Sequence, residues 1–377
     1  MASLKYFRLL SKRSVCVICA LLAVLMIFVN FKGFIQKQDT TATVFSHRRV
    51  AVKHVKNNTR SVLNRSTQRE IILTPDNAVL NIVIILKNTK RNPNLQARFE
   101  TLIKSVYMKS SVLLSFHVIC DTDGGKVATS TIRRFAPKET KIVIYNVTEM
   151  TQKVGEQITQ MQAHFSNGAN AYYGDPLFFL SMVLHRVLQL DKVIMLDVDL
   201  KFDEDIRHLY EIFSLFSERN IIGIARENQP VYRHLFHQYR GKNPSTRVGA
   251  PPPSGLTGFN SGVLLLNLEK MRLSNAYNSL IDSSKTLERL KQKYSFQGHL
   301  GDQDFYTLTC LENEELYFVL PCSWNWQLCV WWRDHGYSQV FDQYYICSEK
   351  IKIYHGNCNS NIPTLSWETE TKKFPQR

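Results

Sequence analysis

Pairs of aspartates separated by one residue are the clearest candidates for chemistry in this sequence. Two carboxylates at that spacing can hold a divalent cation when they follow a buried strand, an arrangement found in metal-dependent nucleotide chemistry. The spacing is common by itself, so the residues around each pair must distinguish a cation site from a structural role. Four pairs occur: Asp121/Asp123, Asp197/Asp199, Asp203/Asp205 and Asp302/Asp304.

The pair formed by Asp197 and Asp199 has the context that a cation site needs. It directly follows the apolar run 193–196, which we predict to be a strand, and a helix predicted to begin at Asp175 and Pro176 precedes that strand. The pair would then lie at the carboxyl end of a strand in a doubly wound sheet, where such sheets bind ligands. We therefore predict that these two carboxylates bind a metal ion.

Two of the other pairs have simpler structural explanations. Asp203 and Asp205 open an amphipathic segment, where acidic residues in the first turn of a helix interact favourably with its dipole. Asp121 and Asp123 follow the predicted strand 116–120, but two glycines come next, which favours a turn. We expect neither pair to bind the metal.

Apolar runs of strand length alternate with helical patterns from residue 80 onwards. Because these runs are continuous, we expect strands that are covered on both faces and hence an α/β layered sheet. The predicted strands span residues 81–86, 116–120, 141–147, 193–196, 221–225 and 263–268.

Cysteines are concentrated near the C-terminus. Four of the six that lie outside the N-terminal apolar run fall within 322–358, at spacings that match no zinc-binding pattern, so we expect two disulfides there. Their pairing is not determined by the sequence, and Cys120 and Cys310 either bond to each other or stay free. The four clustered cysteines are Cys322, Cys329, Cys347 and Cys358.

Four tryptophans fall within nine residues of the same segment. Tryptophan rings serve both as platforms for sugars and as core residues beside disulfides, and the sequence favours neither role over the other. Among Trp324, Trp326, Trp331 and Trp332, we expect Trp331 or Trp332 to contact an acceptor molecule.

The N-terminal region has the composition of a membrane anchor and its linker. We predict a cytosolic tail over 1–14, a signal-anchor helix over 15–35 and a solvated stem over 36–77, since basic residues precede the apolar run and no small-residue cleavage pattern follows it. The alternative is a cleaved signal peptide. The anchor places the rest of the chain in the lumen of the endoplasmic reticulum or Golgi, and N-glycosylation sequons occur at Asn57, Asn64 and Asn146.

The formal net charge of +15 belongs mainly to this leader. Residues 1–75 contain 13 Lys or Arg against two acidic residues, whereas the remainder of the chain is nearly neutral. The basic leader is also poor in the aromatic residues that interleave with basic ones at nucleic-acid interfaces. We therefore expect no nucleic-acid partner.

The order of several short motifs resembles that of a known enzyme family. After the aspartate pair come Phe259-Asn260-Ser261-Gly262, Gly301-Asp302-Gln303-Asp304 and Tyr354-His355-Gly356-Asn357, with a tryptophan-rich segment before the last. In this order the motifs resemble the retaining glycosyltransferases of family 8, which have the GT-A (Rossmann-like) fold. The resemblance implies a single catalytic domain over 78–363, followed by a C-terminal tail over 364–377.

Within that family the motifs are most similar to those of a xylosyltransferase. The resemblance implies transfer of xylose from UDP-xylose, with Mn²⁺, in a retaining α1,3 linkage onto the xylose of xylosyl-glucose O-linked to EGF-like repeats such as those of Notch. A homodimer is compatible with it. Two alternatives stay open: another UDP-sugar transferase of the family, and a carbohydrate-binding protein of the same fold without turnover. A phosphoryl-transfer enzyme is disfavoured because no Gly-rich phosphate loop with a lysine is present.

The resemblance also implies roles for individual residues. This family often has a lysine shortly after the histidine that corresponds to His355, but this sequence has none there. The residue that contacts the phosphate is therefore not assigned. The implied metal ligands are Asp197, Asp199 and His355; the catalytic residues are Gln303 and Asp302; the donor-binding residues are Ile85, Leu86, Lys87, Val198, Asn260, Ser261, Gly262, Leu300, Gly356 and Asn357; and the acceptor-binding residues are Trp331, Trp332 and Asn325.

Overall fold

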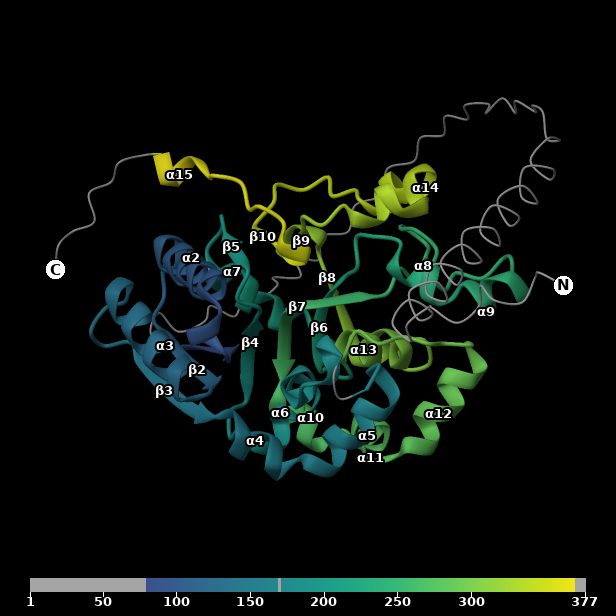
Figure 1. Ribbon diagram of the computed structural model, residues 1–377, viewed down its shortest axis with the longest axis horizontal. Helices are drawn as coiled ribbons and strands as arrows, with labels where there is room; N and C mark the ends of the chain where they lie inside the picture. Colours follow the sequence, from purple (N-terminus) through teal and green to yellow (C-terminus); the bar gives the residue numbers. More distant parts are fainter. Residues whose placement is uncertain (1–78, 169–170, 370–377) are drawn as a thin grey trace, which may run out of the picture. The chain divides into compact units, whose positions relative to one another are not determined.

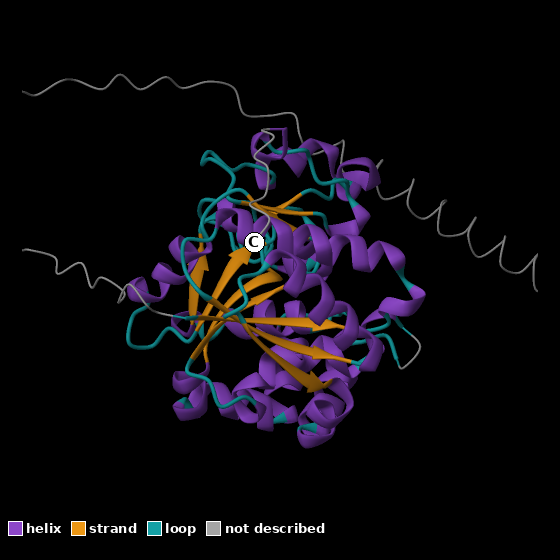
Figure 2. Ribbon diagram, turned by 90° about the vertical axis from the view of Figure 1, so that its left-hand side faces the viewer, coloured by secondary structure: helices purple, strands orange, loops and turns teal. Residues whose placement is uncertain are grey.

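The computed structural model describes residues 79–168 and 171–369. Within them, seven strands form one sheet in the order β3-β2-β1-β4-β7-β6-β8, and three short strands form a second sheet in the order β5-β10-β9 (Figures 1 and 2). The large sheet contains β1 (Leu80–Leu86), β2 (Leu114–Cys120), β3 (Lys141–Asn146), β4 (Lys192–Leu196), β6 (Ile222–Arg226), β7 (Phe259–Asn267) and β8 (Tyr317–Leu320); the small one contains β5 (Leu200–Phe202), β9 (Trp326–Gln327) and β10 (Ile353–His355).

All six predicted strands are confirmed, but the sheet is mixed rather than wholly parallel. Strands β3, β2, β1 and β4 run parallel, whereas β7 runs antiparallel to both β4 and β6. The direction of β7 depends on how it pairs with β4 and β6, and the apolar pattern of 263–268 does not specify this pairing. The result is an α/β fold with one reversed strand in the large sheet.

Helices cover both faces of the large sheet and create two apolar cores (Figure 2). One core lies under α2, α3 and α7, and the other lies under the helices from α4 to α6 and from α10 to α13. The helices are α2 (Pro93–Lys109), α3 (Thr122–Phe135), α4 (Val147–Lys153), α5 (Gly155–Phe165), α6 (Leu180–Val187), α7 (Ile206–Glu211), α8 (Val231–Leu235), α9 (His237–Lys242), α10 (Leu268–Leu273), α11 (Asn275–Asp282), α12 (Ser284–Lys293), α13 (Asp302–Cys310), α14 (Ser338–Tyr344) and α15 (Ser366–Thr369).

The expectation that every strand is covered on both faces is wrong for β3. This strand is the edge of the large sheet, and its side chains are exposed or half-buried, with Ile144 44% exposed. The apolar composition of 141–147 therefore reflects pairing with β2 and packing of one face, not full burial.

The predicted turn after β2 is instead the start of a helix. Asp121 is the N-cap of α3, and its carboxylate accepts hydrogen bonds from the backbone N–H groups of Gly124 and Asn88. Glycine at 124 is explained by close packing, because a Cβ there would collide with the carbonyl oxygen of Leu86. The aspartate pair at 121/123 is thus structural, as predicted, but it caps a helix.

The cap predicted at Asp175 is confirmed, whereas Asp205, predicted to lie in the first turn of a helix, is instead the N-cap of α7. The Asp175 carboxylate accepts from the N–H of Leu177 at 3.1 Å, and a 3₁₀ turn, Pro176–Phe179, leads into α6. The Asp205 carboxylate accepts from the N–H of Arg207 at 2.9 Å at the start of α7. An acidic residue at either position offsets unpaired backbone donors.

Two disulfides join the C-terminal loops, as predicted: Cys322–Cys347 and Cys329–Cys358. Cys120 and Cys310 are buried and free. The predicted signal anchor, 15–35, and stem lie outside the described residues. No helix in 79–168 or 171–369 has the length and apolar character required to cross a bilayer.

Candidate active site

Three side chains from two different sheets meet at the carboxyl end of β4. Asp197 and Asp199 follow β4 directly, and the N–H of Asp197 is bonded to the carbonyl oxygen of Gly262 on β7 at 2.9 Å. Strand β10 pairs antiparallel with β5, which places His355 opposite Leu200. The small sheet therefore brings a histidine from near the C-terminus to the aspartate pair.

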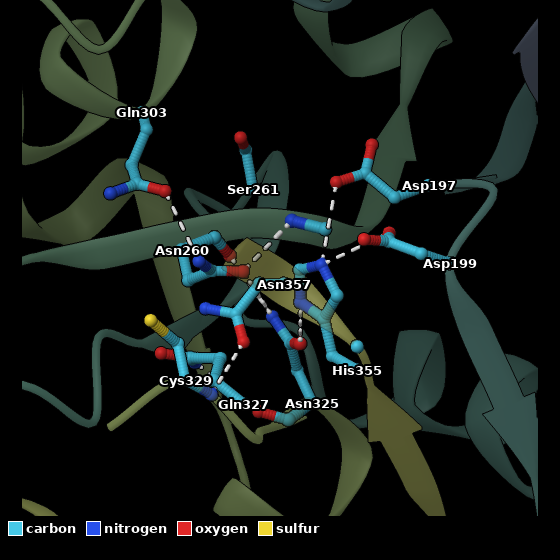
Figure 3. A network of polar contacts seen from close by, with 12 residues as sticks. Asp197, Asp199, Asn260, Ser261, Gln303, Asn325, Gln327, Cys329, His355 and Asn357 are labelled. Atoms are coloured by element: carbon cyan, nitrogen blue, oxygen red, sulfur yellow. Dashed lines mark hydrogen bonds and ion pairs between the residues drawn. The ribbon is translucent and has the colours of Figure 1, made fainter. Parts of the chain in front are cut away.

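The three side chains form a compact cluster of potential ligands (Figure 3). The Nε2 atom of His355 lies 3.3 Å from Oδ1 of Asp199 and 3.7 Å from Oδ2 of Asp197. Ligand atoms of the three residues all lie within 4.8 Å of one another, while the carboxylate of Asp197 opens toward solvent. Two carboxylates and an imidazole are a donor set that suits a divalent ion such as Mn²⁺.

The charges in this cluster act on one another. Burial acts to lower the pKa of His355, but the carboxylates of Asp199 and Asp197 outweigh burial, and the pKa is raised. Burial acts to raise the pKa of Asp199, but His355 and Arg98 outweigh burial, and the pKa is lowered. The site therefore favours an ionised carboxylate at Asp199.

Arg98, on α2, supplies positive charge at the same place. Its Nη1 atom donates to Oδ2 of Asp199 at 3.1 Å and to the carbonyl oxygen of Gly356 at 2.8 Å. The side chain also lines the cleft beside the metal cluster. The sequence contains no local signal for this contact, because Arg98 and Asp199 are 101 residues apart and only the packing of α2 against β5 brings them together.

A polar network extends from the metal cluster toward Gln303 (Figure 3). Asn260 donates from Nδ2 to Oε1 of Gln303 at 3.2 Å and to Oε2 of Glu227 at 3.3 Å. Gln303 also donates to Glu227 across a longer distance of 3.5 Å. Burial raises the pKa of Glu227 to about 7, an effect that its hydrogen bond from Asn260 partly opposes.

Asp302 lies at the start of α13 and is fixed by two hydroxyl groups. Ser261 donates to its Oδ1 at 2.9 Å, and Ser181 donates to its Oδ2. Burial raises the pKa of Asp302 to about 6, and the serine hydrogen bonds oppose that increase. Asp304, two residues later, is fully buried and accepts from the hydroxyl of Tyr232 at 2.9 Å, so its role is structural.

These groups surround one cleft of about 840 Å³. The cleft extends from the end of β1, past the cluster of Asp197, Asp199 and His355, to the tryptophan segment near α8. Among the predicted residues it is lined by Ile85, Lys87, Asp197, Val198, Asp199, Asn260, Ser261, Gly262, Leu300, Asp302, Gln303, Trp331, Trp332, His355 and Asn357.

Three of the predicted site residues do not line the cleft. Leu86 is fully buried in the core under α2 and α3, because alternate side chains of β1 face opposite sides of the sheet. Gly356 lies behind the metal cluster, where its N–H bonds the carbonyl oxygen of Asp199. Asn325 is only 2% exposed and lies between His355 and Asn260, so its predicted contact with an acceptor is replaced by a position behind the site.

Two of the four tryptophans pack inside the C-terminal segment, and the other two line the cleft. Trp324 is buried, and Trp326 packs on Tyr345 with ring centroids 4.5 Å apart. Trp331 is 49% exposed and lines the cleft together with Trp332. We call Trp331 and Trp332 the aromatic shelf. The disulfide Cys329–Cys358 joins the shelf segment to the loop that follows His355.

The neighbours of the shelf are aromatic and imidazole rings. The ring of His335 stacks on Trp331 at 3.7 Å between centroids, and His234 lies 5.0 Å from Trp332. His234 also lines the cleft, and its Nδ1 is 2.8 Å from the hydroxyl of Tyr337. The shelf is therefore a surface with flat apolar rings and polar edges, which is typical of sugar-binding sites.

Comparison with known proteins identifies the family. The model of the family described as glycosyl transferase family 8 matches residues 96–355, which include the three potential metal ligands and the shelf. The chain belongs to glycosyl transferase family 8. It is a glycosyltransferase, and the family that the order of motifs suggested is confirmed.

Several relatives of this family 8 enzyme are known. Xyloside xylosyltransferase 1 of Homo sapiens is 44% identical over 293 residues, which cover 75% of this chain and 74% of that protein. The crystal structure of mouse xyloside xylosyltransferase 1 in its apo form aligns with a TM-score of 0.73 at 43% identity, covering 76% of this chain and 100% of the crystallised chain. Xylosyl- and glucuronyltransferase LARGE1 of Homo sapiens is 27% identical over 263 residues, 68% of this chain and 30% of that protein.

Sequence reasoning did not assign several polar residues to this family 8 site, among them Arg98, Glu227, Gln229 and His234. Arg98 and Glu227 contact predicted site residues, and Gln229 and His234 line the cleft. Glu227, Gln229 and His234 lie in the segment after β6, where a charged residue directly follows a buried strand. That position is the same signal that identified the aspartate pair after β4, and it was available in the sequence.

Proposed function

We propose that this protein transfers xylose from UDP-xylose to the xylose of a xylosyl-glucose acceptor, with Mn²⁺ as the metal. The observation that carries the proposal is a single cleft that joins the Asp197, Asp199 and His355 cluster to an aromatic shelf. The printed name of the relative that is 44% identical, a xyloside xylosyltransferase, supports xylose as the sugar and a xyloside as the acceptor.

The finer features of the reaction are proposed on the resemblance of the motifs. They are an α1,3 linkage, retention of configuration at the anomeric carbon, and an acceptor carried by EGF-like repeats. The predicted signal anchor over 15–35 would hold the enzyme in the membrane of the endoplasmic reticulum or Golgi with the catalytic domain in the lumen. A homodimer stays a prediction.

The residues of the cleft would have separate roles in the reaction. Asp197, Asp199 and His355 would hold the cation, which supplies Lewis-acid neutralisation of the charge that develops on the departing diphosphate. Arg98 lies beside Asp199 and adds a fixed positive charge at that end of the cleft. The geometry thus favours departure of UDP through electrostatics.

The donor sugar would lie between this end and Gln303. Asp302 is held by Ser181 and Ser261, so its carboxylate is oriented before a substrate binds. Gln303 is an amide and is not an ordinary nucleophile, which supports a mechanism in which the acceptor attacks from the face that the phosphate leaves. The amide would stabilise positive charge on the anomeric carbon through its carbonyl oxygen.

A transfer assay tests the proposal directly. Full-length protein is incubated with Mn²⁺, UDP-xylose and an EGF-like repeat bearing xylosyl-glucose, and the product is measured by mass spectrometry. We expect the mass of one added pentose, and we expect a slot fitted to xylose to reject UDP-glucose because of its extra hydroxymethyl group. Transfer of a different sugar would show another enzyme of the family, and sugar binding without transfer would show a binding protein.

Two substitutions test the site assignment within the same assay. Asp199→Asn removes a charged ligand and Gln303→Ala removes the amide, and we expect each to lower kcat by about 100-fold or more, as loss of a charged or preorganised group at a reaction centre does. Asp123→Asn is a matched control, because Asp123 is an acidic residue of the first turn of α3 outside the cleft. Unchanged kcat in both site variants would disprove the assignment.

A further inference from the structure

Asn325 lies directly behind the metal ligand His355. Its side chain is 2% exposed, and its Oδ1 atom is 2.9 Å from Nδ1 of His355. On the other side, its Nδ2 atom is 2.9 Å from Oδ1 of Asn260 and 3.3 Å from the carbonyl oxygen of Asn260. One buried amide therefore bridges the metal cluster and the network that leads to Gln303 (Figure 3).

The orientation of this amide is determined by groups that have only one hydrogen-bonding role. The carbonyl oxygen of Asn260 can only accept, so the atom of Asn325 that faces it must be the NH₂ nitrogen. The side chain of Asn260 is fixed in the same way, because its Oδ1 accepts from the N–H of Gly262 at 3.1 Å and its Nδ2 faces the carboxylate of Glu227. Oδ1 of Asn325 must consequently face His355.

This orientation determines the tautomer of the neutral imidazole. Because Oδ1 of Asn325 can only accept, Nδ1 of His355 must carry the hydrogen. Nε2 is then bare and points at the carboxylates of Asp199 and Asp197. A bare Nε2 is the form in which histidine binds a metal ion.

We propose that Asn325 is a positioning residue that holds His355 in the Nδ1–H tautomer and couples the metal cluster to Asn260 and Gln303. The inference rests on the proposed metal dependence and adds to it a residue that touches neither the metal nor a substrate. Without the amide, the hydrogen of the neutral ring can move to Nε2, where the carboxylate of Asp199 accepts it and competes with the cation.

Two substitutions at this position separate the two contacts. Asn325→Leu keeps the number and branching of the side-chain heavy atoms and removes the hydrogen bonds to both His355 and Asn260. Asn325→Asp keeps an acceptor for the Nδ1–H of His355 but places an oxygen against the two oxygens of Asn260, which repels that residue. The leucine variant should therefore lose metal affinity, whereas the aspartate variant should keep the metal and misplace Asn260 and Gln303.

The structure also provides a matched control. Buried His185 and half-buried Asn278 form a second histidine–asparagine pair, with Nε2 of His185 3.1 Å from Oδ1 of Asn278, and neither residue lines the cleft. Asn278→Leu breaks a histidine–asparagine contact of the same kind. It should lower thermal stability without changing metal affinity.

The test is calorimetric titration of Mn²⁺ into metal-free, full-length protein. It is carried out on the wild type and on the three variants, and the folding of each protein is checked by circular dichroism. We expect Asn325→Leu to weaken Mn²⁺ binding about 10–100-fold, the cost typical of removing the hydrogen-bond partner of a ligating histidine. Asn325→Asp should bind Mn²⁺ more tightly than the leucine variant but have a kcat at least about tenfold below that of the wild type, with little change in donor KM.

Each outcome bears on a separate claim. Wild-type affinity in Asn325→Leu, or equal weakening in both Asn325 variants, would overturn the assignment of Asn325. No Mn²⁺ binding by the wild type would overturn the proposed metal dependence itself, and the inference with it. If the leucine variant does not fold, ¹⁵N NMR of histidine-labelled wild type at a pH where the ring is neutral decides the question, since an Nε2–H tautomer at His355 contradicts the inference.

Discussion

Glu227 is a buried carboxylate that is surrounded by amide hydrogen-bond donors. Its side chain is 3% exposed and is surrounded by amides: Asn260, Gln303 and Gln229 all donate to it. Among the described residues no ion pair involves this carboxylate, so its charge is stabilised by these neutral donors together with the nearby charge of His355. A charge buried in this way is costly, and a carboxyl group with a perturbed pKa in a cleft is a candidate for a functional role.

Glu227→Gln tests this cost through the pH dependence of stability. Burial raises the pKa of Glu227 from 4.5 to about 7, so the folded protein holds a proton that the unfolded chain releases. The resulting stability is fully present below pH 4.5 and is lost as the pH rises through about 7. The glutamine variant lacks this loss, and its unfolding free energy relative to wild type should rise by up to about 3 kcal/mol between pH 5 and pH 8.

The same variant should be less active, because an NH₂ group replaces an oxygen that accepts from Asn260 and Gln303. Differential scanning calorimetry at both pH values and the transfer assay give the two readouts. Glu218→Gln is the control, since Glu218 is exposed and lies outside the cleft. A pH-independent difference in stability between Glu227→Gln and wild type would contradict the argument.

At the scale of elements, the site depends on how closely β7 passes the small sheet. Gly262 on β7 bonds Asp197 through its carbonyl oxygen at 2.9 Å and lies against the ring of His355 on its other side. A Cβ at 262 would lie 2.7 Å from Nδ1 of His355 and closer still to Cε1. The absence of a side chain here therefore allows two strands to bring both kinds of ligand together.

Gly262→Ala should displace His355 and reduce Mn²⁺ affinity by about tenfold or more, with a stability cost of about 1–3 kcal/mol from overpacking. Calorimetric Mn²⁺ titration and thermal unfolding measure the two effects. Gly241→Ala is the control for a substitution without overpacking, because a Cβ at 241 meets no atom within 4 Å. It should leave Mn²⁺ affinity unchanged and, since Gly241 lies in α9, raise stability by up to about 1 kcal/mol. Wild-type Mn²⁺ affinity in Gly262→Ala would show that β7 does not determine the position of the histidine.

The elements also show what the sequence determines. Six strands could be predicted because each is a continuous apolar run, and Asp197 and Asp199 could be found because they follow one of these runs. The reversed direction of β7 and the contact of Arg98 with Asp199 could not be predicted, since both depend on partners far away in the chain. Asn325 was assigned to the site but to the wrong contact, because burial is a property of the folded neighbourhood.

At the scale of the whole molecule, the prediction to test is the compartment in which the catalytic domain lies. The predicted anchor places everything after residue 35 in the lumen, and the described residues include one N-glycosylation sequon, Asn146-Val147-Thr148. Asn146 is exposed at the end of the edge strand β3, and its Oδ1 caps α4 by accepting from the N–H of Thr148 at 2.9 Å. This contact uses the oxygen and leaves the amide nitrogen, the atom to which a glycan is attached, turned away from the cap.

If the topology is correct, Asn146 should carry a glycan when the full-length protein is made in mammalian cells. Thr148→Ala removes the sequon but keeps the capping asparagine, so we expect the loss of one glycan, measured as a shift in intact mass before and after glycosidase treatment. Thr148→Ser keeps the sequon and should retain the glycan. The sequons at Asn57 and Asn64 precede the domain, so glycans there without one at Asn146 would confirm entry into the lumen but show that this edge of the sheet is not modified. A chain without any glycan would place the catalytic domain outside the lumen and contradict the predicted anchor.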